Sequence, residues 1–146
     1  MANGLRSDIR PPATYVLVID DEPVIADTLV HILRNAGFAA LAAYDGQSAL
    51  ESAKVAPPQV VIADVGLGRM NGVDVAMAIE DSVPDAKALL LSAGADFVDL
   101  SRARALGHDF PMLAKPVSPN QLLDMVRHLA PVEMHDQKGK VQNENG

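Results

Sequence analysis

Short apolar runs alternate with amphipathic stretches through most of the chain. The runs are rich in β-branched or small residues and too short for typical helices, so they predict buried strands. These strands are expected at residues 15–19, 38–44, 59–63, 88–91 and 112–114. Apolar residues recur at helical spacing between the runs and after the last one, which predicts helices. The helices are expected to begin near residues 23, 47, 73, 96 and 119.

Strands and helices thus alternate five times, and this alternation is typical of a parallel sheet with helices on both faces. Right-handed crossovers are nearly obligatory in such folds. We therefore expect an α/β domain with a doubly wound, five-stranded parallel sheet of the flavodoxin-like order 2-1-3-4-5, accompanied by five helices.

The length of 146 residues suits one domain of ordinary size. We place this domain at residues 14–130. Residues 1–13 are polar, include Pro11-Pro12, and predict a flexible N-terminal arm. Residues 131–146 are polar, so we expect a disordered tail that is too short for a DNA-binding or catalytic domain.

Composition and charge narrow the functional classes. No apolar run approaches the ~20 residues of a membrane span, and the first ten residues do not resemble a signal peptide. We therefore expect a cytoplasmic protein without a membrane partner. The net charge of −7 argues against a general nucleic-acid binder, and the basic cluster of Arg102, Arg104 and His108 is interpreted as a solvated helix face. The absence of cysteine rules out disulfides and thiolate chemistry.

Polar side chains follow four of the predicted strands at their carboxyl ends. Asp20 and Asp21 follow the first strand, Asp64 the third, Ser92 the fourth and Lys115 the fifth. Carboxyl ends of parallel strands meet at one edge of the sheet, where ligands bind. Three close carboxylates repel one another unless a cation lies between them, and an all-oxygen site suits Mg²⁺. A carboxylate, a metal, a hydroxyl and a lysine are also the groups that phosphoryl transfer requires.

Each of these residues has a simpler interpretation when taken alone. Asp21 or Glu22 is suited to cap the helix that begins near Pro23. Asp64 is suited to open a turn, and Ser92 to be an ordinary loop hydroxyl. Lys115 is suited to be a solvated strand end. The functional interpretation depends on all of them sharing one edge of the sheet. The glycines of the loop after Asp64 do not form a P-loop, because the lysine and Ser/Thr of that motif are missing.

Four motifs at these strand ends resemble the receiver domain of two-component response regulators. The motifs are VLVIDDEP, VVIADVGLGRMNG, LLLSAGAD and LAKPVSP. Asp21, Asp64, Ser92 and Lys115 are separated by 43, 28 and 23 residues, which are intervals close to those of the family. The resemblance covers about residues 14–130 and implies a domain that accepts a phosphoryl group and signals by phosphorylation-dependent protein–protein interaction.

The resemblance also implies a role for each position of the acceptor site. Asp64 is implied as the phospho-acceptor that attacks a phosphohistidine in line. Lys115 is implied as the ligand of a phosphoryl oxygen, and Ser92 as the hydroxyl that moves towards the phosphoryl group and reports its presence. A cis bond between Lys115 and Pro116 is implied as well.

A magnesium site is implied at the same place. The side chains of Asp21 and Asp64 would bind Mg²⁺ directly. Gly66 would bind the ion through its backbone carbonyl, and Asp20 mostly through water. No other cofactor is implied.

The chain departs from the family at two places that concern the switch. Gly68 stands where proline is usual, which should loosen the loop after the acceptor. Met112 stands where the family usually has Tyr or Phe, an aromatic ring that turns inward when the Ser/Thr moves. Phe110 is nearby in a segment one residue longer than usual, so it is an alternative candidate for the switch role by another path. We hypothesise that signalling depends on Ser92 and the backbone of the loop after it.

The resemblance implies a stand-alone response regulator with a sensor histidine kinase as its phosphodonor. A downstream protein would bind the face made by the fourth helix, the fifth strand and the fifth helix. The alternative is a phosphate shuttle or sink in a phosphorelay with a histidine phosphotransfer protein. An aspartyl-phosphate phosphatase is disfavoured, because the second acid that such enzymes need is replaced by Gly66. We therefore expect a phosphoprotein that phosphorylates itself from a donor rather than an enzyme.

Overall fold

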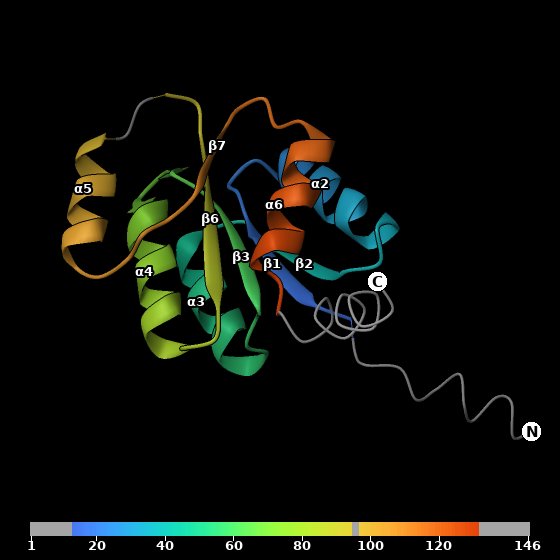
Figure 1. Cartoon of the computed structure of the whole chain (residues 1–146), viewed down its shortest axis with the longest axis horizontal. Coiled ribbons are helices and arrows are strands. Elements are labelled where there is room, and N and C mark those ends of the chain that lie inside the picture. The colour runs from blue at the N-terminus through green and yellow to red at the C-terminus, as the bar shows by residue number, and fades with distance from the viewer. Residues whose placement is uncertain (1–12, 95–96, 132–146) are drawn as a thin grey trace, which may run out of the picture.

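A five-stranded parallel sheet carries helices on both faces (Figure 1). The structure is a computed structural model that describes residues 13–94 and 97–131. The sheet strands are β1 (Tyr15–Ile19), β2 (Ala39–Ala43), β3 (Val60–Asp64), β6 (Lys87–Ser92) and β7 (Met112–Ala114). The helices are α2 (Pro23–Asn35), α3 (Gly46–Val55), α4 (Gly72–Ser82), α5 (Phe97–Ala105) and α6 (Pro119–Leu129).

The strand order is β2-β1-β3-β6-β7, which confirms the predicted doubly wound order. Helices α2 and α6 cover one face, while α3, α4 and α5 cover the other (Figure 1). Predicted and observed ends of these elements differ by about one residue. The difference that matters is Asp64, which was expected just after its strand but belongs to β3 and lies opposite Leu91 of β6.

The central strand β3 is buried along its whole length, because both faces of the sheet are covered. Val61 and Ala63 pack towards α3 and α4, whereas Val60 and Ile62 pack towards α2 and α6. Full burial of a Val or Ile side chain stabilises the fold by about 1.5–3 kcal/mol relative to exposure. The two layers of core therefore hold the end of β3, and with it Asp64, in a fixed place.

The expected helix boundaries have identifiable causes. Asp45, Asn71 and Ser118 cap α3, α4 and α6, because the side chain of each accepts a hydrogen bond from a backbone N–H of the first turn. Helices α2 and α5 end close to Gly37 and Gly107, whose positive φ angles of 98° and 93° are typical of glycines that stop helices.

The start of α2 differs from the cap that we expected. Glu22 occupies the N-cap position but makes no side-chain capping bond. Asp20 instead accepts a hydrogen bond from the Glu22 N–H through Oδ1, at 2.9 Å. The turn between β1 and α2 is thus stabilised by a carboxylate of the candidate site.

The glycine-rich segment after Asp64 forms a short hairpin rather than an irregular loop. β4 (Gly66–Leu67) pairs antiparallel with β5 (Met70–Asn71) across a two-residue turn. Gly68 takes the first turn position with a φ of 70°, a conformation that glycine adopts readily and hairpin turns favour. Gly68 therefore has a defined structural role where we expected only a loosened loop.

The side chain of Arg34 caps one carbonyl group on the outer edge of strand β2. Arg34, near the end of α2, donates two hydrogen bonds to the carbonyl oxygen of Ala40 on β2, at 3.0 and 2.7 Å. The edge strand is otherwise composed of small residues and one half-exposed leucine, Leu41. An unpaired carbonyl at the middle of this edge is thereby satisfied within the molecule.

Two expectations concern parts of the chain that the structure describes little or not at all. The predicted arm and tail, residues 1–13 and 131–146, lie outside the described residues apart from residues 13 and 131. Among the helices of the described ranges, none has the length and apolar character that crossing a membrane requires.

Candidate functional site

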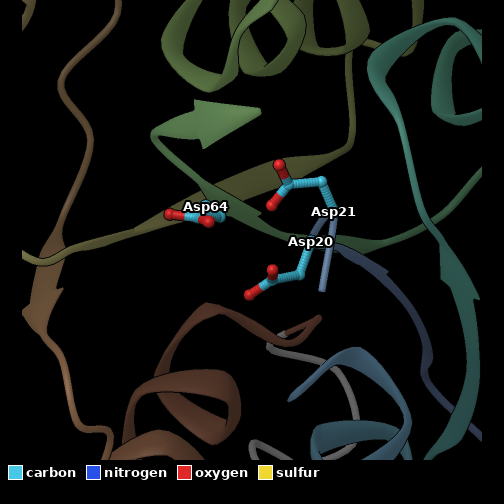
Figure 2. Close-up of side chains that lie close together, drawn as sticks. All are labelled: Asp20, Asp21 and Asp64. Carbon is cyan, nitrogen blue, oxygen red and sulfur yellow. The ribbon is translucent and has the colours of Figure 1, made fainter. Parts of the chain in front are cut away.

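Three carboxylates converge at the carboxyl ends of β1 and β3 (Figure 2). Asp20 and Asp21 directly follow β1, and Asp64 ends β3. The two strands are neighbours with Ile19 opposite Ala63, so their next residues are brought together. Asp20, Asp21 and Asp64 each offer a carboxylate oxygen, and these oxygens lie within 4.8 Å of one another.

Two of these acids are buried, and each has partners that compensate its charge. Asp20 is 0 % exposed, Asp64 is 7 % exposed, and Asp21 is exposed. Buried carboxylates are expensive to desolvate unless they are paired or hydrogen-bonded. Asp64 Oδ1 accepts from the Gly66 N–H at 3.3 Å, and its Oδ2 lies 3.0 Å from Lys115 Nζ. Asp20 accepts from Glu22 N–H and lies 3.4 Å from the same ammonium group.

Lys115 joins the site from the end of β7. Its N–H donates to the carbonyl of Ser92 at 2.9 Å, which ties the ends of β6 and β7 together, and its bond to Pro116 is cis, as the resemblance implied. Burial alone lowers the pKa of Lys115, but the hydrogen bond to Asp64 and the charges of Asp64 and Asp20 raise it above its ordinary value. The side chain therefore stays an ammonium ion at neutral pH.

Ser92 closes the site on the side of β6. The residue is buried, lies opposite Ala114, and its hydroxyl makes hydrogen bonds with the carbonyl and the N–H of Gly94. Ser92, Asp64 and Lys115 line one cavity of about 420 Å³. Asp21 and Gly66 line the same cavity, whereas the buried Asp20 contacts Lys115, which lines it.

The structure thus brings together the five side chains that the sequence placed at one edge of the sheet. Gly66 follows Asp64 by two residues, and a Cβ at Gly66 would meet no atom within 4 Å, so this side of the site is open. The cavity also includes Glu22, which the sequence suggested only as a helix cap.

Gly72 packs against the site but was not singled out from the sequence. A Cβ at Gly72 would lie 1.8 Å from the carbonyl oxygen of Asp64, and the Gly72 N–H donates to Val65 at 2.8 Å. The start of α4 therefore packs directly against the backbone of the acid. The available signal was a glycine at the predicted start of a helix, where a better helix former is expected unless space is short.

The carboxylates form a candidate site for a small divalent cation. All donors are hard oxygens, which suit Mg²⁺ rather than zinc or copper. The oxygens of Asp20, Asp21 and Asp64 lie within 4.8 Å of one another, so the three side chains are close enough to hold such an ion together. The Oδ2 atom of Asp64 lies 3.0 Å from Lys115 Nζ. One carboxylate oxygen of Asp64 could therefore bind the ion while the other stays available.

The aromatic residue that the sequence considered as a switch is already buried. Phe110 is 7 % exposed and belongs to the core beneath α4 and α5, whereas Met112 lies opposite Leu90 and is partly buried. No aromatic side chain stands at the usual family position, in agreement with the sequence.

Comparison with known proteins gives a consistent result. The model of the response regulator receiver domain family matches residues 16–127. The chain is 36 % identical over 125 residues to the probable transcriptional regulatory protein TcrX of Mycobacterium tuberculosis, covering 85 % of this chain and 52 % of TcrX. The chain thus spans about half the length of the curated relatives it matches.

Solved structures agree with the fold and the family. The chemotaxis protein CheY4 of Vibrio cholerae is similar with a TM-score of 0.73 and 28 % identity, over 80 % of this chain and 98 % of that one. A response regulator of Burkholderia pseudomallei that carries a phosphorylated aspartic acid and a calcium ion is also similar, with a TM-score of 0.70 and 27 % identity. The similarity covers 91 % of this chain and 75 % of that one.

The sheet order, the acidic cluster beside a lysine and the match over most of the chain point to one family. The chain belongs to the response regulator receiver domain family of two-component signalling systems.

Proposed function

We propose that this chain is a response regulator of the cytoplasm, which accepts a phosphoryl group on Asp64 from the phosphohistidine of a sensor kinase. The observation that supports this most strongly is the pairing of a largely buried carboxylate with an ammonium group 3.0 Å away in an open cavity. In this proposal the protein acts as a phosphoprotein that is modified once per signal, and not as an enzyme that turns over many substrate molecules.

The carboxylate of Asp64 acts as the nucleophile in this proposal. A bond forms between an Asp64 oxygen and phosphorus while the bond from phosphorus to the donor nitrogen breaks, and the imidazole of the donor keeps the electron pair. Lys115 then binds an oxygen of the transferred group and offsets its charge. The contact from Lys115 to Asp20 keeps the ammonium in place during the exchange.

Asp20, Asp21, Asp64 and the carbonyl of Gly66 would hold Mg²⁺. When bound, the ion supplies positive charge to the phosphoryl oxygens and relieves repulsion among the carboxylates. Asp21 is exposed and contacts the cavity, so it suits direct ligation, while the buried Asp20 suits contact through water.

Ser92 would report the phosphoryl group. Its hydroxyl is held by Gly94 at the beginning of the loop that leads to α5. If the hydroxyl turns to a phosphoryl oxygen, its bonds to Gly94 are lost and the backbone at Gly94 is free to move. The signal would then reach the face formed by α5, β7 and α6, where a downstream protein would bind.

The phosphodonor would dock beside the cavity. An apolar groove of about 510 Å³ between α2 and α6 is lined by Val24, Thr28, Val117 and, at its end, Lys115. Val24 is 78 % exposed. A donor histidine must approach Asp64 within bonding distance, so its protein has to cover the surface next to Lys115, and this groove offers apolar contact there.

The shuttle or sink remains as a second candidate function because the cavity is open on two sides. A Cβ at either Gly66 or Gly94 would meet no atom within 4 Å, so neither position carries a side chain that shields the acceptor. Transfer of the phosphoryl group from Asp64 back to a histidine phosphotransfer protein would favour the shuttle. A phosphoryl group that is retained until a partner binds would favour the signalling protein.

The primary test is intact-mass analysis after incubation with Mg²⁺ and acetyl phosphate. One added phosphoryl group is expected for the wild type and none for Asp64→Asn or in EDTA. Lys115→Ala should be labelled far more slowly. Undiminished labelling of Asp64→Asn would remove the proposed acceptor.

A further inference from the structure

His108 is enclosed between two acids at the end of α4. It lies in the connection from α5 to β7, which runs across α4 in Figure 1, and its side chain is 9 % exposed. Nδ1 forms a 2.7 Å hydrogen bond with Glu80 Oε1, and Nε2 is paired with Asp81 Oδ1 at 3.1 Å. Each ring nitrogen of His108 therefore faces a carboxylate oxygen, one from Glu80 and one from Asp81. This contradicts the interpretation of His108 as part of a solvated basic face.

The anchor extends beyond α4. Glu80 uses its second oxygen, Oε2, to accept a hydrogen bond from the Ala88 N–H of β6 at 2.9 Å. His108 also donates its own N–H to the carbonyl of Ala103 in α5, at 2.9 Å. The histidine is therefore fixed to three elements, namely α4, α5 and, through Glu80, β6.

Phe110 rests on this anchored ring. The rings of His108 and Phe110 are stacked with centroids 5.6 Å apart and planes inclined by 19°. Phe110 is 7 % exposed and packs in the same core cluster as Ile79 and Ala103. A ring that is buried, stacked and packed in this way has no space to turn further inward.

Phe110 is also remote from the hydroxyl that would report phosphorylation. Ser92 lies opposite Ala114, and Phe110 precedes Ala114 by four residues. An extended chain covers about 13 Å in four residues, which exceeds the movement that rotation of a serine side chain produces. Met112, two residues from Ala114 and opposite Leu90, lies nearer and is only partly buried.

We propose that His108 is a positioning residue that holds Phe110 inward both before and after phosphorylation, so that the output change reaches the partner face without rotation of an aromatic ring. The anchoring of Phe110 is independent of the proposed function. Its persistence after phosphorylation rests on the proposed acceptor role of Asp64. The moving side chain on β7 would then be Met112.

Fluorine NMR can follow Phe110 directly, because the chain has only three phenylalanines. The full chain is labelled with 4-fluorophenylalanine, and the Phe110 resonance is assigned with Phe110→Leu. Mg²⁺ and beryllofluoride are then added as a phosphoryl mimic, while the amide resonances of Ser92 and Ala93 report binding. We expect shifted amides and an unmoved Phe110 resonance. Shifted amides together with a clear change at Phe110 would overturn the proposal.

Two variants test the anchor itself without any phosphoryl mimic. Glu80→Gln removes one of the two carboxylates that contact His108 while keeping an oxygen for Ala88, and His108→Leu removes the stacked ring. Both should shift or broaden the Phe110 resonance and make it respond to beryllofluoride, whereas the exposed control His31→Leu should not. An unchanged Phe110 resonance in Glu80→Gln and His108→Leu would refute the anchor. If the amides of Ser92 and Ala93 never respond, the acceptor role fails while these variants still decide the anchor.

Discussion

Gly72 packs against the backbone of Asp64 so closely that a Cβ on the glycine would lie 1.8 Å from the carbonyl oxygen of the acid. The contact comes from the hairpin of β4 and β5, which returns the chain to the end of β3 before α4 begins. The helix start and the candidate acceptor are thus one packed unit, and a change at one must move the other.

Gly72→Ala should therefore disturb both stability and the site. Backbone carbonyls cannot move aside as a flexible side chain can, and overpacking of this kind destabilises proteins by about 1–3 kcal/mol. Chemical denaturation gives the free energy of unfolding, and acetyl phosphate labelling gives the rate at Asp64. Gly94→Ala is the stability control, since its added Cβ would meet no atom within 4 Å. Equal stabilities for the two variants would contradict the packing argument.

Removal of one carboxylate should have opposite effects on protein stability without and with Mg²⁺. Without the ion it relieves repulsion among the acids, and with the ion it weakens metal binding. Without metal, Asp21→Asn should be at least as stable as the wild type, because Asp20, Asp21 and Asp64 lie within 4.8 Å at their oxygens. With Mg²⁺ at about 100 times its dissociation constant, the wild type should gain about 2.7 kcal/mol. Asp21→Asn should lose most of this gain.

Thermal unfolding with and without MgCl₂ measures both effects of Asp21→Asn. Asp85→Asn, at an exposed position outside the site, is the matched control and should keep the full response to Mg²⁺. A wild-type response shared by Asp21→Asn would mean that the ion binds elsewhere.

Loss of the ammonium group should destabilise the protein in a pH-dependent way. Lys115→Met leaves Asp64 and Asp20 without their cation, and we expect a loss of up to about 3 kcal/mol at pH 7. The neighbouring acids raise the pKa of Lys115 in the folded protein. Its stabilising effect is therefore complete below the ordinary lysine pKa of about 10.4 and is lost as the pH rises through the higher folded value.

The measurement is the difference in unfolding free energy between the wild type and Lys115→Met from pH 7 to pH 11. The difference should be constant up to about pH 10 and shrink above it. A difference that vanishes already near neutral pH would show that Lys115 is not held as a charged group.

A charge in the groove between α2 and α6 should separate donor docking from chemistry. Val24→Glu places a carboxylate on apolar surface and should slow transfer from a histidine phosphoprotein by about tenfold, the equivalent of about 1.4 kcal/mol. Labelling by acetyl phosphate should be unchanged, because Val24 does not line the acceptor cavity. Val55→Glu, equally exposed at the end of α3, should affect neither reaction. Equal slowing with both phosphodonors would place the defect in the acceptor site.

Local patterns in the sequence predicted the parts of this fold that depend on burial. The strand YVLVI could be identified because both its faces are covered, which demands a continuous apolar run. Asp20, Asp64 and Ser92 could be placed at one edge because strand ends in a parallel sheet coincide. Knowledge of the strand order was enough to bring them together.

The structural features that the sequence did not predict depend on contacts between residues far apart in the chain. His108 pairs with Glu80 across 28 residues, and neither carries a local signal of burial. The strands of the hairpin after Asp64 are only two residues long, too short for any period to show. The closeness of Gly72 to Asp64 follows from that hairpin, and the glycine at the predicted helix start was its one local signal.

The bond from Arg34 to the edge carbonyl of Ala40 has a consequence for the behaviour of the protein in concentrated solution. A guanidinium that occupies the outer margin of β2 leaves an incoming chain no acceptor at that point and presents it with a positive charge. Strand addition from a second molecule is thereby opposed. Arg34→Ala should leave the monomer folded yet make it more prone to cross-β aggregation on heating, so one side chain protects the colloidal solubility of the whole domain.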